Sequence, residues 1–354
     1  MSRFFSAKYN TLTPYTPGEQ PRDQQYIKLN TNESPFPPSP LAQQRAQEEA
    51  AMLQLYSDPT CVSLTSAAAK ALGVAADEIL FSNGSDEVLN FAFMAFCDAD
   101  TPAIFPDITY GFYKVFAQLN GIPYEQIPLK EDFTIDLRDY AARNATIFIA
   151  NPNAPTGLYL SLDKIEQIVK NNPCSVVVID EAYIDFGGES AIPLTKKYDN
   201  LLVVQTFSKS RSMAGARLGF AVGCKNLIQD LNTIKYSTNP YNVNRMTMAA
   251  GVGALEDVDY FRGNCRAIMD NRSWTTSELA KLGFTTLPSL TNFVFTKNEA
   301  ISGKEFYLKL KSKGILVRHF DIPRLTDYVR VTIGSAEQMA AFIRTTKEIL
   351  EEMK

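Results

Sequence analysis

Apolar residues in the middle of the chain come in short unbroken runs that are separated by amphipathic stretches. These runs are rich in β-branched residues and do not alternate with polar ones, which is typical of strands in a parallel sheet covered on both faces. The pattern predicts strands at residues 78–82, 145–150, 175–180 and 201–207. Between them, Ser161 is placed to cap a helix with one apolar face, and a further helix is expected to begin near Asp86.

After about residue 244 the pattern changes. It predicts a long helical region at 246–282, strands at 291–296, 314–319 and 328–333, and a final helix with apolar residues at helical spacing. Helices that flank a few alternating strands favour a separate α+β domain. The first forty residues are rich in Pro, Tyr and Asn and are interpreted as an arm laid over another part of the protein.

We therefore predict an α/β fold whose mostly parallel central sheet is sandwiched by helices. The expected parts are an N-terminal arm (1–40) that packs with the small domain and a partner subunit, a large domain (41–245) and a smaller α+β domain (246–354). A chain of 354 residues is long enough for this division.

Composition narrows the function classes. An apolar fraction of 45% and a charged fraction of 21% are ordinary for a soluble globular protein. The net charge of −4 argues against a nucleic-acid partner. No stretch is apolar enough to cross a bilayer, and residues 1–5 lack the features of a signal peptide, so we expect a cytoplasmic protein without a membrane partner.

Cysteine and histidine usage narrows the chemistry. The five cysteines are scattered without a C-x-x-C pair, so free thiols are expected rather than disulfides or a zinc site. The single histidine, His319, argues against a multi-histidine metal centre and against a nucleophile with its usual histidine base, so no metal is expected. Its simplest interpretation is a half-buried strand residue. Lysine, carboxylates, tyrosines or a cofactor must then supply the chemistry.

Polar groups follow the ends of the predicted strands, and ligands bind beyond the carboxyl ends of strands in open parallel sheets. NGSDE (83–87) opens a helix, whose free N–H groups and dipole favour an anion such as phosphate. NPNAPTG (151–157) and DEAY (180–183) follow the next two strands, and Ser-Lys (208–209) and then Arg217 follow the fourth. One edge of the sheet therefore holds a phosphate cradle, an amide, an acid, a phenol, a lysine and an arginine.

Pyridoxal phosphate uses all of these groups together. A lysine joins its aldehyde in a Schiff base, a carboxylate keeps its ring nitrogen protonated, and a phenol and an amide bond its O3′. Serine, arginine and a helix N-terminus hold its phosphate. Taken singly, each group has a simpler interpretation as a solvated lysine, a helix cap or a common turn. Their joint occurrence in this order favours the cofactor.

Several segments resemble a known family. NPNAPTG, DEAY and SKSRSMAGARLG resemble the signature segments of fold-type-I pyridoxal-phosphate aminotransferases, and the resemblance extends over almost the whole chain. LTPY (12–15), KLNTNESPFPPSP (28–40), GSDE, ITYGFY and VRVTIGS narrow it to the branch that acts on histidinol phosphate. The resemblance implies a cytosolic homodimer with shared sites. Its reaction would convert histidinol phosphate and 2-oxoglutarate into imidazole acetol phosphate and L-glutamate in histidine biosynthesis.

The resemblance also implies roles for individual residues. Lys209 would be the Schiff-base lysine, Asp180 the partner of the ring nitrogen, and Tyr183 the donor to O3′. The other expected cofactor ligands are Tyr110 at the ring face, Gly84, Ser85, Asp86, Ser208 and Arg217 at the phosphate, and Tyr56 at the phosphate in the partner subunit. The family commonly has Asn directly before Pro-Thr-Gly, where this chain has Ala154, so Asn153 is expected to take over the O3′ contact.

For the substrate, the resemblance implies that Arg330 binds its anionic end, since a planar guanidinium accepts a phosphate or a carboxylate bidentately. Arg318 or Arg211 would be a further phosphate ligand. Tyr15, Asn32 and Tyr110 are expected to form the wall beside the imidazole. Tyr15 fits surface packing of a proline-flanked arm equally well.

Other functions stay open. A threonine-phosphate decarboxylase and an aromatic amino acid aminotransferase share the fold and the lysine, so turnover with each amine separates them. A non-catalytic homologue would typically lack the lysine or the aspartate, and both are present. A P-loop or dinucleotide site is not favoured, since neither G-x-x-x-x-G-K nor G-x-G-x-x-G follows a strand.

Overall fold

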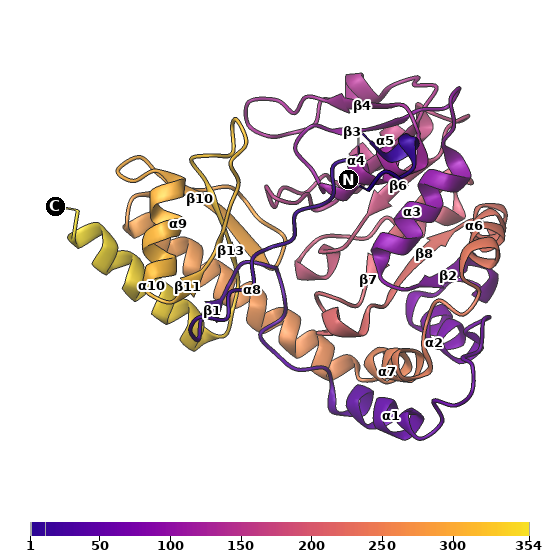
Figure 1. Cartoon of the computed structure of the whole chain (residues 1–354), viewed down its shortest axis with the longest axis horizontal. Coiled ribbons are helices and arrows are strands. Elements are labelled where there is room, and N and C mark those ends of the chain that lie inside the picture. The colour runs from indigo at the N-terminus through magenta and orange to yellow at the C-terminus, as the bar shows by residue number, and fades with distance from the viewer. Residues whose placement is uncertain (1, 11, 354) are drawn as a thin grey trace.

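The computed structural model describes residues 2–10 and 12–353; Met1 and Thr11 of the predicted arm and Lys354 of the predicted C-terminal domain lie outside the described residues. A seven-stranded sheet forms the centre of the larger part of the molecule (Figure 1), in the order β2-β8-β7-β6-β5-β3-β4. Its strands are β2 (Ile79–Ser82), β3 (Ala103–Pro106), β4 (Tyr124–Ile127), β5 (Thr146–Ala150), β6 (Val177–Asp180), β7 (Leu201–Thr206) and β8 (Gly219–Gly223). Neighbours are parallel except at β8, which is antiparallel to both β2 and β7.

Helices cover both faces of this sheet, and the central strands are buried on both sides. In β6, Val177 and Ile179 pack in one core and Val178 in the opposite one, and all three are fully buried. The first core includes α1 (Pro40–Ala50), α2 (Val62–Leu72), α5 (Leu162–Lys170) and α7 (Arg245–Glu256). The second includes α3 (Ser85–Phe96), α4 (Phe112–Asn120) and α6 (Lys225–Thr238). Two-sided burial explains the unbroken apolar runs. The four strands predicted here are confirmed as β2, β5, β6 and β7.

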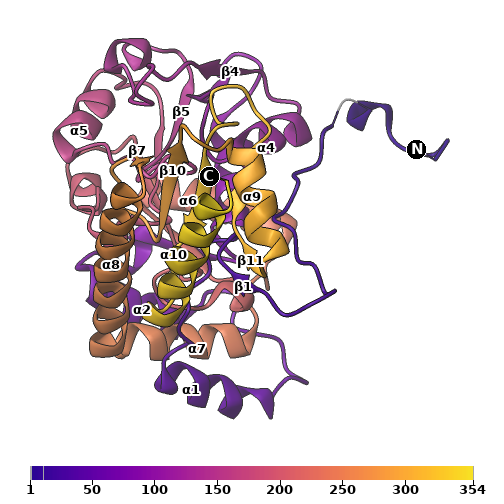
Figure 2. The same ribbon diagram turned by 90° about the vertical axis from the view of Figure 1, so that its left-hand side faces the viewer.

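A second, antiparallel sheet lies in the C-terminal third, in the order β12-β13-β10-β9. Its strands are β9 (Phe284–Thr286), β10 (Phe293–Asn298), β12 (Arg318–His319) and β13 (Val329–Thr332). The helices that pack on it are α8 (Val258–Lys281), α9 (Gly303–Ser312) and α10 (Ala336–Glu351). Figure 2 shows α8 and α10 side by side over this part of the molecule, and they share a core.

Two expectations about this region are wrong in detail. The helical region predicted at 246–282 is two helices, because the backbone leaves helical geometry at Asp257, and α7 packs on α1 and α2. The strand predicted at 314–319 is also two, since β11 (Ile315–Leu316) pairs with β1 (Ile27–Lys28), whereas β12 pairs with β13. The domain boundary at residue 245 stays a prediction.

The N-terminal segment packs on the C-terminal third, where β1 and β11 form a separate two-stranded sheet, before it leads into α1. Its strand β1 runs parallel to β11, and farther along, the N–H of Asn32 donates to Oγ1 of Thr332 over 2.9 Å. Figure 1 shows this indigo trace passing from the small sheet to α1, and Figure 2 shows the N-terminal end standing apart from the body. None of the helices that the structure describes is long and apolar enough to span a membrane.

Candidate active site

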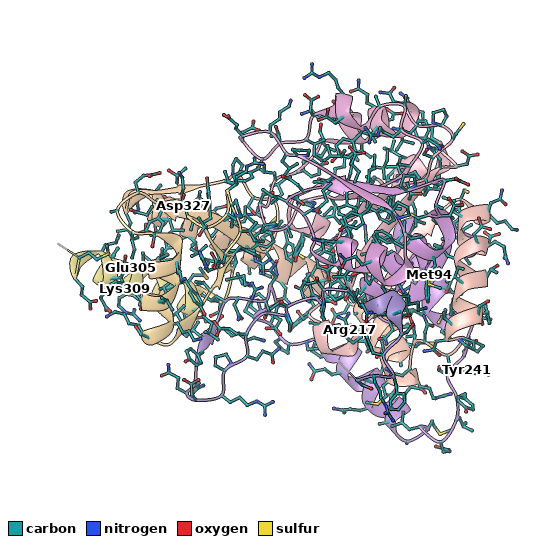
Figure 3. The ribbon with its side chains drawn as sticks, turned by 45° about the horizontal axis from the view of Figure 1, so that its top comes forward. Met94, Arg217, Tyr241, Glu305, Lys309 and Asp327 are labelled. Atoms are coloured by element: carbon teal, nitrogen blue, oxygen red, sulfur yellow. The ribbon has the colours of Figure 1, made fainter. Side chains whose placement is uncertain are left out.

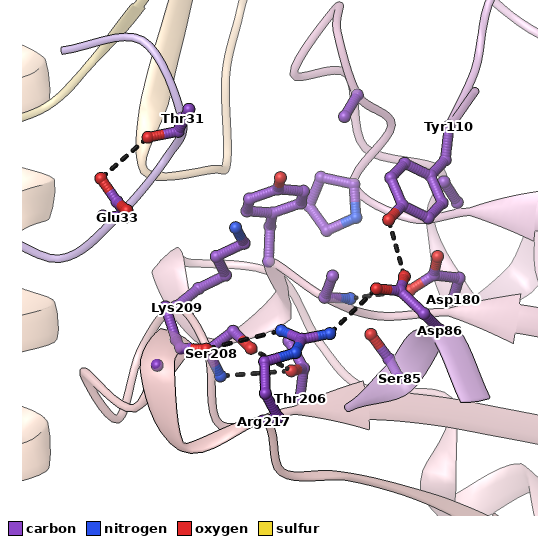
Figure 4. Close-up of a pocket in the computed structure, with 17 residues that line it drawn as sticks. Thr31, Glu33, Ser85, Asp86, Tyr110, Asp180, Thr206, Ser208, Lys209 and Arg217 are labelled. Atoms are coloured by element: carbon purple, nitrogen blue, oxygen red, sulfur yellow. Dashed lines mark hydrogen bonds and ion pairs between the residues drawn. The ribbon is translucent and has the colours of Figure 1, made fainter. Parts of the chain in front are cut away.

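A cavity of about 340 Å³ lies where β5, β6 and β7 end, opposite the start of α3 (Figure 4). Each strand delivers its last residue to the wall: Ala150, Asp180 and Thr206. The other residues that line it are Thr31, Glu33, Ser85, Asp86, Tyr110, Pro152, Ala154, Ala182, Tyr183, Ser208, Lys209, Ala214, Gly215 and Arg217. The strand ends therefore bring most of the expected cofactor ligands into one place, as the topology requires.

Lys209 is carried by a tight turn at the end of β7. The hydroxyl of Thr206 accepts a hydrogen bond from the N–H of Ser208 (3.2 Å) and donates one to its Oγ (3.0 Å). The N–H of Met213 then donates to the carbonyl of Phe207 over 3.0 Å, which closes the turn. Nζ of Lys209 lies 5.8 Å from the centre of the Tyr183 ring. A flexible side chain is thus mounted on a rigid, buried base.

Asp180 is the last residue of β6 and is only 4% exposed. Its Oδ2 accepts a hydrogen bond from the phenol of Tyr113 over 2.9 Å, and its Oδ1 accepts one from the N–H of Ala182 over 3.2 Å. Burial raises the pKa of this carboxyl to about 6, although the bond from Tyr113 acts in the opposite sense. Tyr113 is a site residue that sequence analysis missed, because a tyrosine on the apolar face of a helix is usually a core residue.

Asp86 and Arg217 form the far end of the cavity. Nη2 of Arg217 lies 3.0 Å from Oδ2 of Asp86, and the phenol of Tyr110 donates to Oδ1 of the same carboxylate over 2.6 Å (Figure 4). Burial raises the pKa of Tyr110 well above its usual value, so it acts as a neutral donor. Ser85 is the first residue of α3, so free backbone N–H groups face this end.

Two glycines allow the close approach of these segments. Gly84 has a φ of +80°, and a Cβ there would lie 2.4 Å from Nη2 of Arg217. A Cβ on Gly219 would lie 2.3 Å from the backbone nitrogen of Ser85. Both positions exclude a side chain, which makes them part of the cradle. Sequence analysis singled out Gly84 but missed Gly219, whose contact partner is far away in the chain.

A second cavity of about 460 Å³ adjoins the first and shares Tyr110, Tyr183 and Lys209 with it. Arg318 and Arg330 are register partners on β12 and β13 and both line it. Arg330 lies between two rings, 5.2 Å from the centre of Phe293 and 5.5 Å from that of Phe320.

The Arg330 guanidinium has a hydrogen-bond donor that no described residue accepts. Its Nη2 donates to the carbonyl of Asn30 over 3.1 Å, but its buried Nε finds no hydrogen-bond partner within residues 2–10 and 12–353. Burial lowers the pKa of this guanidinium. An orphan donor beside a second guanidinium is suited to an anionic ligand, since an unpaired buried polar group is costly.

The remaining wall of the second cavity comes from the N-terminal arm. Tyr15 stacks on Phe112 with 4.3 Å between ring centres. Asn32 is 2% exposed, and its Nδ2 donates to the hydroxyl of Tyr183 over 2.9 Å. Tyr183 is held in turn by an edge-to-face contact with Phe293 at 5.2 Å. The structure therefore places Tyr15 and Asn32 at the cavity, where sequence analysis expected them.

Comparison with known proteins identifies the family. The sequence model for aminotransferase class I and II matches residues 24–345. This chain belongs to that aminotransferase family. It is 50% identical to a histidinol-phosphate aminotransferase of Brachyspira hyodysenteriae, over 99% of this chain and 100% of that protein. It is 45% identical to one of Clostridium botulinum over 100% of both chains.

The fold of this aminotransferase agrees with solved structures of the family. The crystal structure of histidinol-phosphate aminotransferase from Sinorhizobium meliloti in complex with pyridoxal-5'-phosphate superposes with a TM-score of 0.86. The two chains are 24% identical, and the match covers 94% of this chain and 93% of the other. The predicted fold, a mostly parallel sheet between helices, is confirmed.

Three of the predicted ligands of this aminotransferase, one of them expected to serve the partner subunit, do not line either cavity. Nδ2 of Asn153 donates to the carbonyl of Ile108 and to Oγ1 of Thr156, both over 3.0 Å, so its amide joins its own loop to the segment at Ile108. Ala154 lines both cavities, whereas Asn153 lines neither, so the contact of Asn153 with the cofactor stays a prediction. Arg211 also points away, since its Nη1 donates to the carbonyl of Ala254 and its guanidinium lies 4.0 Å from the ring centre of Phe261.

Tyr56 is the third. It is 81% exposed and stacks on Tyr241, with 4.7 Å between ring centres. Figure 3 shows Tyr241 well apart from Arg217, so Tyr56 lies away from the cavities of its own chain. A contact between Tyr56 and cofactor phosphate therefore requires a second subunit. No three His, Cys, Asp or Glu side chains of the described residues come together as a metal site.

Proposed function

We propose that this aminotransferase binds pyridoxal phosphate and transfers the amino group of histidinol phosphate to 2-oxoglutarate, giving imidazole acetol phosphate and L-glutamate in histidine biosynthesis. The observation that carries the proposal is the convergence of Lys209, Asp180 and Arg217 on one cavity. Relatives that are 45% and 50% identical over their whole length and are named histidinol-phosphate aminotransferase support the substrate.

The residues of the first cavity fit the cofactor. The N–H groups at the start of α3, the hydroxyl of Ser208 and the guanidinium of Arg217 would hold its phosphate, and the side-chain-free cradle of Gly84 and Gly219 leaves room for it. Asp180 would face the ring nitrogen, Tyr183 the O3′ and Tyr110 the ring face. When bound, pyridoxal phosphate supplies an electron sink for the charge that develops at the substrate's Cα.

Lys209 is the residue placed to move the proton. Its side chain lines both cavities, so Nζ has access to the cofactor side and to the substrate side. Its Nζ would take up and move the proton of the substrate's Cα, and bound pyridoxal phosphate would supply the aldehyde and the electron sink for that chemistry. Asp180 must be ionised to keep the ring nitrogen protonated, and the hydrogen bond from Tyr113 favours that form.

Arg330 and Arg318 would bind the anionic end of each substrate in turn. One half-reaction presents a phosphate and the other a carboxylate, and a guanidinium fork accepts either. The unpartnered Nε of Arg330 supports this role. Tyr15 and Asn32 would form the wall beside the imidazole ring, because they line the same cavity.

We infer a homodimer with shared sites. Met52, Leu53 and Leu55 are exposed near Tyr56, and clustered apolar exposure of this kind is typical of an interface. Tyr56 would then contact the cofactor phosphate of the partner subunit. The cytoplasmic location and the division into arm, large domain and small domain stay predictions.

A panel of amines tests the function. Purified holoenzyme should turn over histidinol phosphate with a higher kcat/KM than phenylalanine, tyrosine or threonine phosphate, with 2-oxoglutarate as acceptor. Release of carbon dioxide from threonine phosphate would favour the decarboxylase instead. Borohydride reduction should fix the cofactor to the peptide that contains Lys209, and a label on another lysine would overturn the site assignment.

A further inference from the structure

Glu19 ties the N-terminal arm to the small sheet's helix α9. Its carboxylate accepts hydrogen bonds from Nζ of Lys311 and from the hydroxyl of Tyr307, both on α9. Its backbone carbonyl accepts a bond from Nδ2 of Asn30 over 2.8 Å. The side chains of Glu19 and Lys311 are 32% and 31% exposed, so this pair is sheltered from solvent on most of its surface. We call these three side chains, Glu19, Lys311 and Tyr307, the arm clamp.

The residues on either side of Glu19 cross the second cavity. Tyr15, Pro17, Gly18 and Gln20 all line it. Gly18 fits closely against the chain beneath, since a Cβ there would lie 2.5 Å from Cγ2 of Thr31. The arm is therefore part of the cavity wall, and its position determines the shape of the site.

The same segment contacts Arg318. Nη2 and Nη1 of Arg318 donate to the carbonyls of Thr16 and Pro17 over 3.4 and 3.5 Å. These bonds lie at the long end of the range for hydrogen bonds, and both acceptors are neutral. The contacts of Glu19, by contrast, include a charge-assisted bond, which is the stronger kind. Tyr307 also stacks on His319, the neighbour of Arg318 in β12, with 6.1 Å between ring centres.

The clamp carboxylate is ionised at neutral pH. Burial opposes ionisation, but the hydrogen bonds from Lys311 and Tyr307 outweigh it and lower the pKa of Glu19. The fixed point of the arm is thus at Glu19, and the weakly held point is at Arg318.

We propose that Glu19 is a positioning residue, whose bonds to Lys311 and Tyr307 hold the arm across the substrate cavity with Tyr15 in its wall and Arg318 facing the substrate's anion. The arm carbonyls keep the long Arg318 side chain ordered before the substrate arrives, which reduces the entropy lost on binding. A phosphate is a stronger acceptor than a carbonyl, so the substrate's phosphate binds the Arg318 guanidinium more strongly than the arm carbonyls do. The identity of that substrate rests on the proposed function; the clamp itself does not.

The test uses the full-length holoenzyme and the variants Glu19→Gln, Lys311→Met and Tyr307→Phe. Glu19→Gln should raise the KM for histidinol phosphate about 10-fold and leave kcat within about twofold, because the residues that move the proton are untouched. Trypsin should also cut after the exposed Arg22 faster than in the wild type, since the arm leaves its seat more often. The double variant Glu19→Gln/Lys311→Met should be no worse than the more affected single variant.

Lys309→Met is the matched control. Lys309 lies on the same helix and pairs with Glu305 at 3.9 Å rather than with the arm (Figure 3). Its KM and its cleavage rate should match the wild type. Unchanged KM and cleavage in Glu19→Gln and Lys311→Met would overturn the proposal, and so would a fall in kcat at constant KM. If the wild type does not turn over histidinol phosphate but Glu19→Gln is still cleaved faster than the wild type, the arm clamp is supported and the proposed function is not.

Discussion

The phenol of Tyr113 donates a hydrogen bond to Oδ2 of Asp180 over 2.9 Å in the interior of the protein. Burial pulls the pKa of this carboxyl up to about 6, and the bond from Tyr113 pulls it down. The balance between the two decides whether Asp180 carries the negative charge that the proposed cofactor needs. A residue outside the cavity wall therefore sets the charge of one inside it.

Removal of that phenol should shift the pH dependence of the enzyme. In Tyr113→Phe, the ionised form of Asp180 loses its donor, so its pKa rises and the acid limb of the kcat profile moves to higher pH. Loss of one hydrogen bond to a charged group, about 1.5 to 3 kcal/mol, would lift the pKa from about 6 to about 7 or 8, so we expect kcat at pH 7 to fall about 2- to 10-fold. Tyr140→Phe is the control, because the buried hydroxyl of Tyr140 has no partner in the part of the chain that the structure describes. An unshifted profile in Tyr113→Phe would contradict the assignment.

Asp180→Asn should make the cofactor-free protein more stable and lower its transaminase rate. The folded-state pKa of about 6 lies above the ordinary 3.8, so the folded protein holds its proton more tightly, and stability from this group falls as pH rises from 3.8 to about 6. Asparagine carries no charge to bury. We expect the cofactor-free variant to be more stable than wild type by roughly 1 to 3 kcal/mol at pH 8, with the gap narrowing below pH 6. Urea unfolding measures this difference, and the transaminase rate should fall by about 1,000-fold or more. Equal stabilities at pH 8 would be the contrary result.

Gly219→Ala should weaken cofactor binding. The new Cβ would meet the backbone of Ser85 at 2.3 Å, and because backbone cannot rotate away, the start of α3 must shift from the phosphate position. We expect the dissociation constant of pyridoxal phosphate to rise at least about 10-fold in an absorbance titration. Gly263→Ala is the control, since a Cβ there meets nothing within 4 Å. Wild-type affinity in Gly219→Ala would show that the two segments separate freely.

Arg330→Lys should reduce kcat/KM for both substrates. An ammonium keeps the charge but not the planar fork, and it leaves the ring-lined space between Phe293 and Phe320 poorly filled. We expect a loss of about 30- to 100-fold, which steady-state kinetics with histidinol phosphate and with glutamate would measure. Arg344→Lys, on the exposed side of α10, should behave like wild type. A loss confined to one substrate would assign the other anion to Arg318.

Shared sites predict rescue in mixed dimers. Tyr56→Ala and Lys209→Ala should each be nearly inactive, but a mixed dimer joins an intact Lys209 of one subunit with an intact Tyr56 of the other. Random mixing should restore about a quarter of the wild-type rate, because half of the dimers are mixed and each has one complete site. Without recovery after exchange of subunits, Tyr56 would not be a residue of the partner's site.

Much of the site follows from the sequence because its chemistry sits at strand ends. Asp180 directly follows an apolar run, Lys209 follows the next predicted strand after Ser208, and parallel strands end at the same edge of a sheet. The order of the motifs along the chain therefore predicts their meeting in space. The long-range partners, Tyr113 and Gly219, carry no such signal, because each contacts a segment that only the folded topology brings near.

Two further features could not be predicted from the sequence. One is the direction in which a loop side chain points, and the other is a helix end that no glycine or proline marks. Asn153 has the right chemistry for the cofactor, but the backbone of its turn aims the amide at Ile108 and Thr156. Likewise, α7 ends at Glu256 and the backbone leaves helical geometry at Asp257, although no glycine or proline marks this position in the sequence.

The pairing of Ile27 with Ile315 constrains the order in which parts of the protein can fold during translation. On the ribosome, every strand of the large sheet emerges before the strand that β1 needs as its neighbour. The lysine and the aspartate can thus take their places early, while the arm waits unpaired until translation is almost complete. In a nascent chain, Lys209 can therefore be in place before the N-terminal arm has completed the wall of the second cavity.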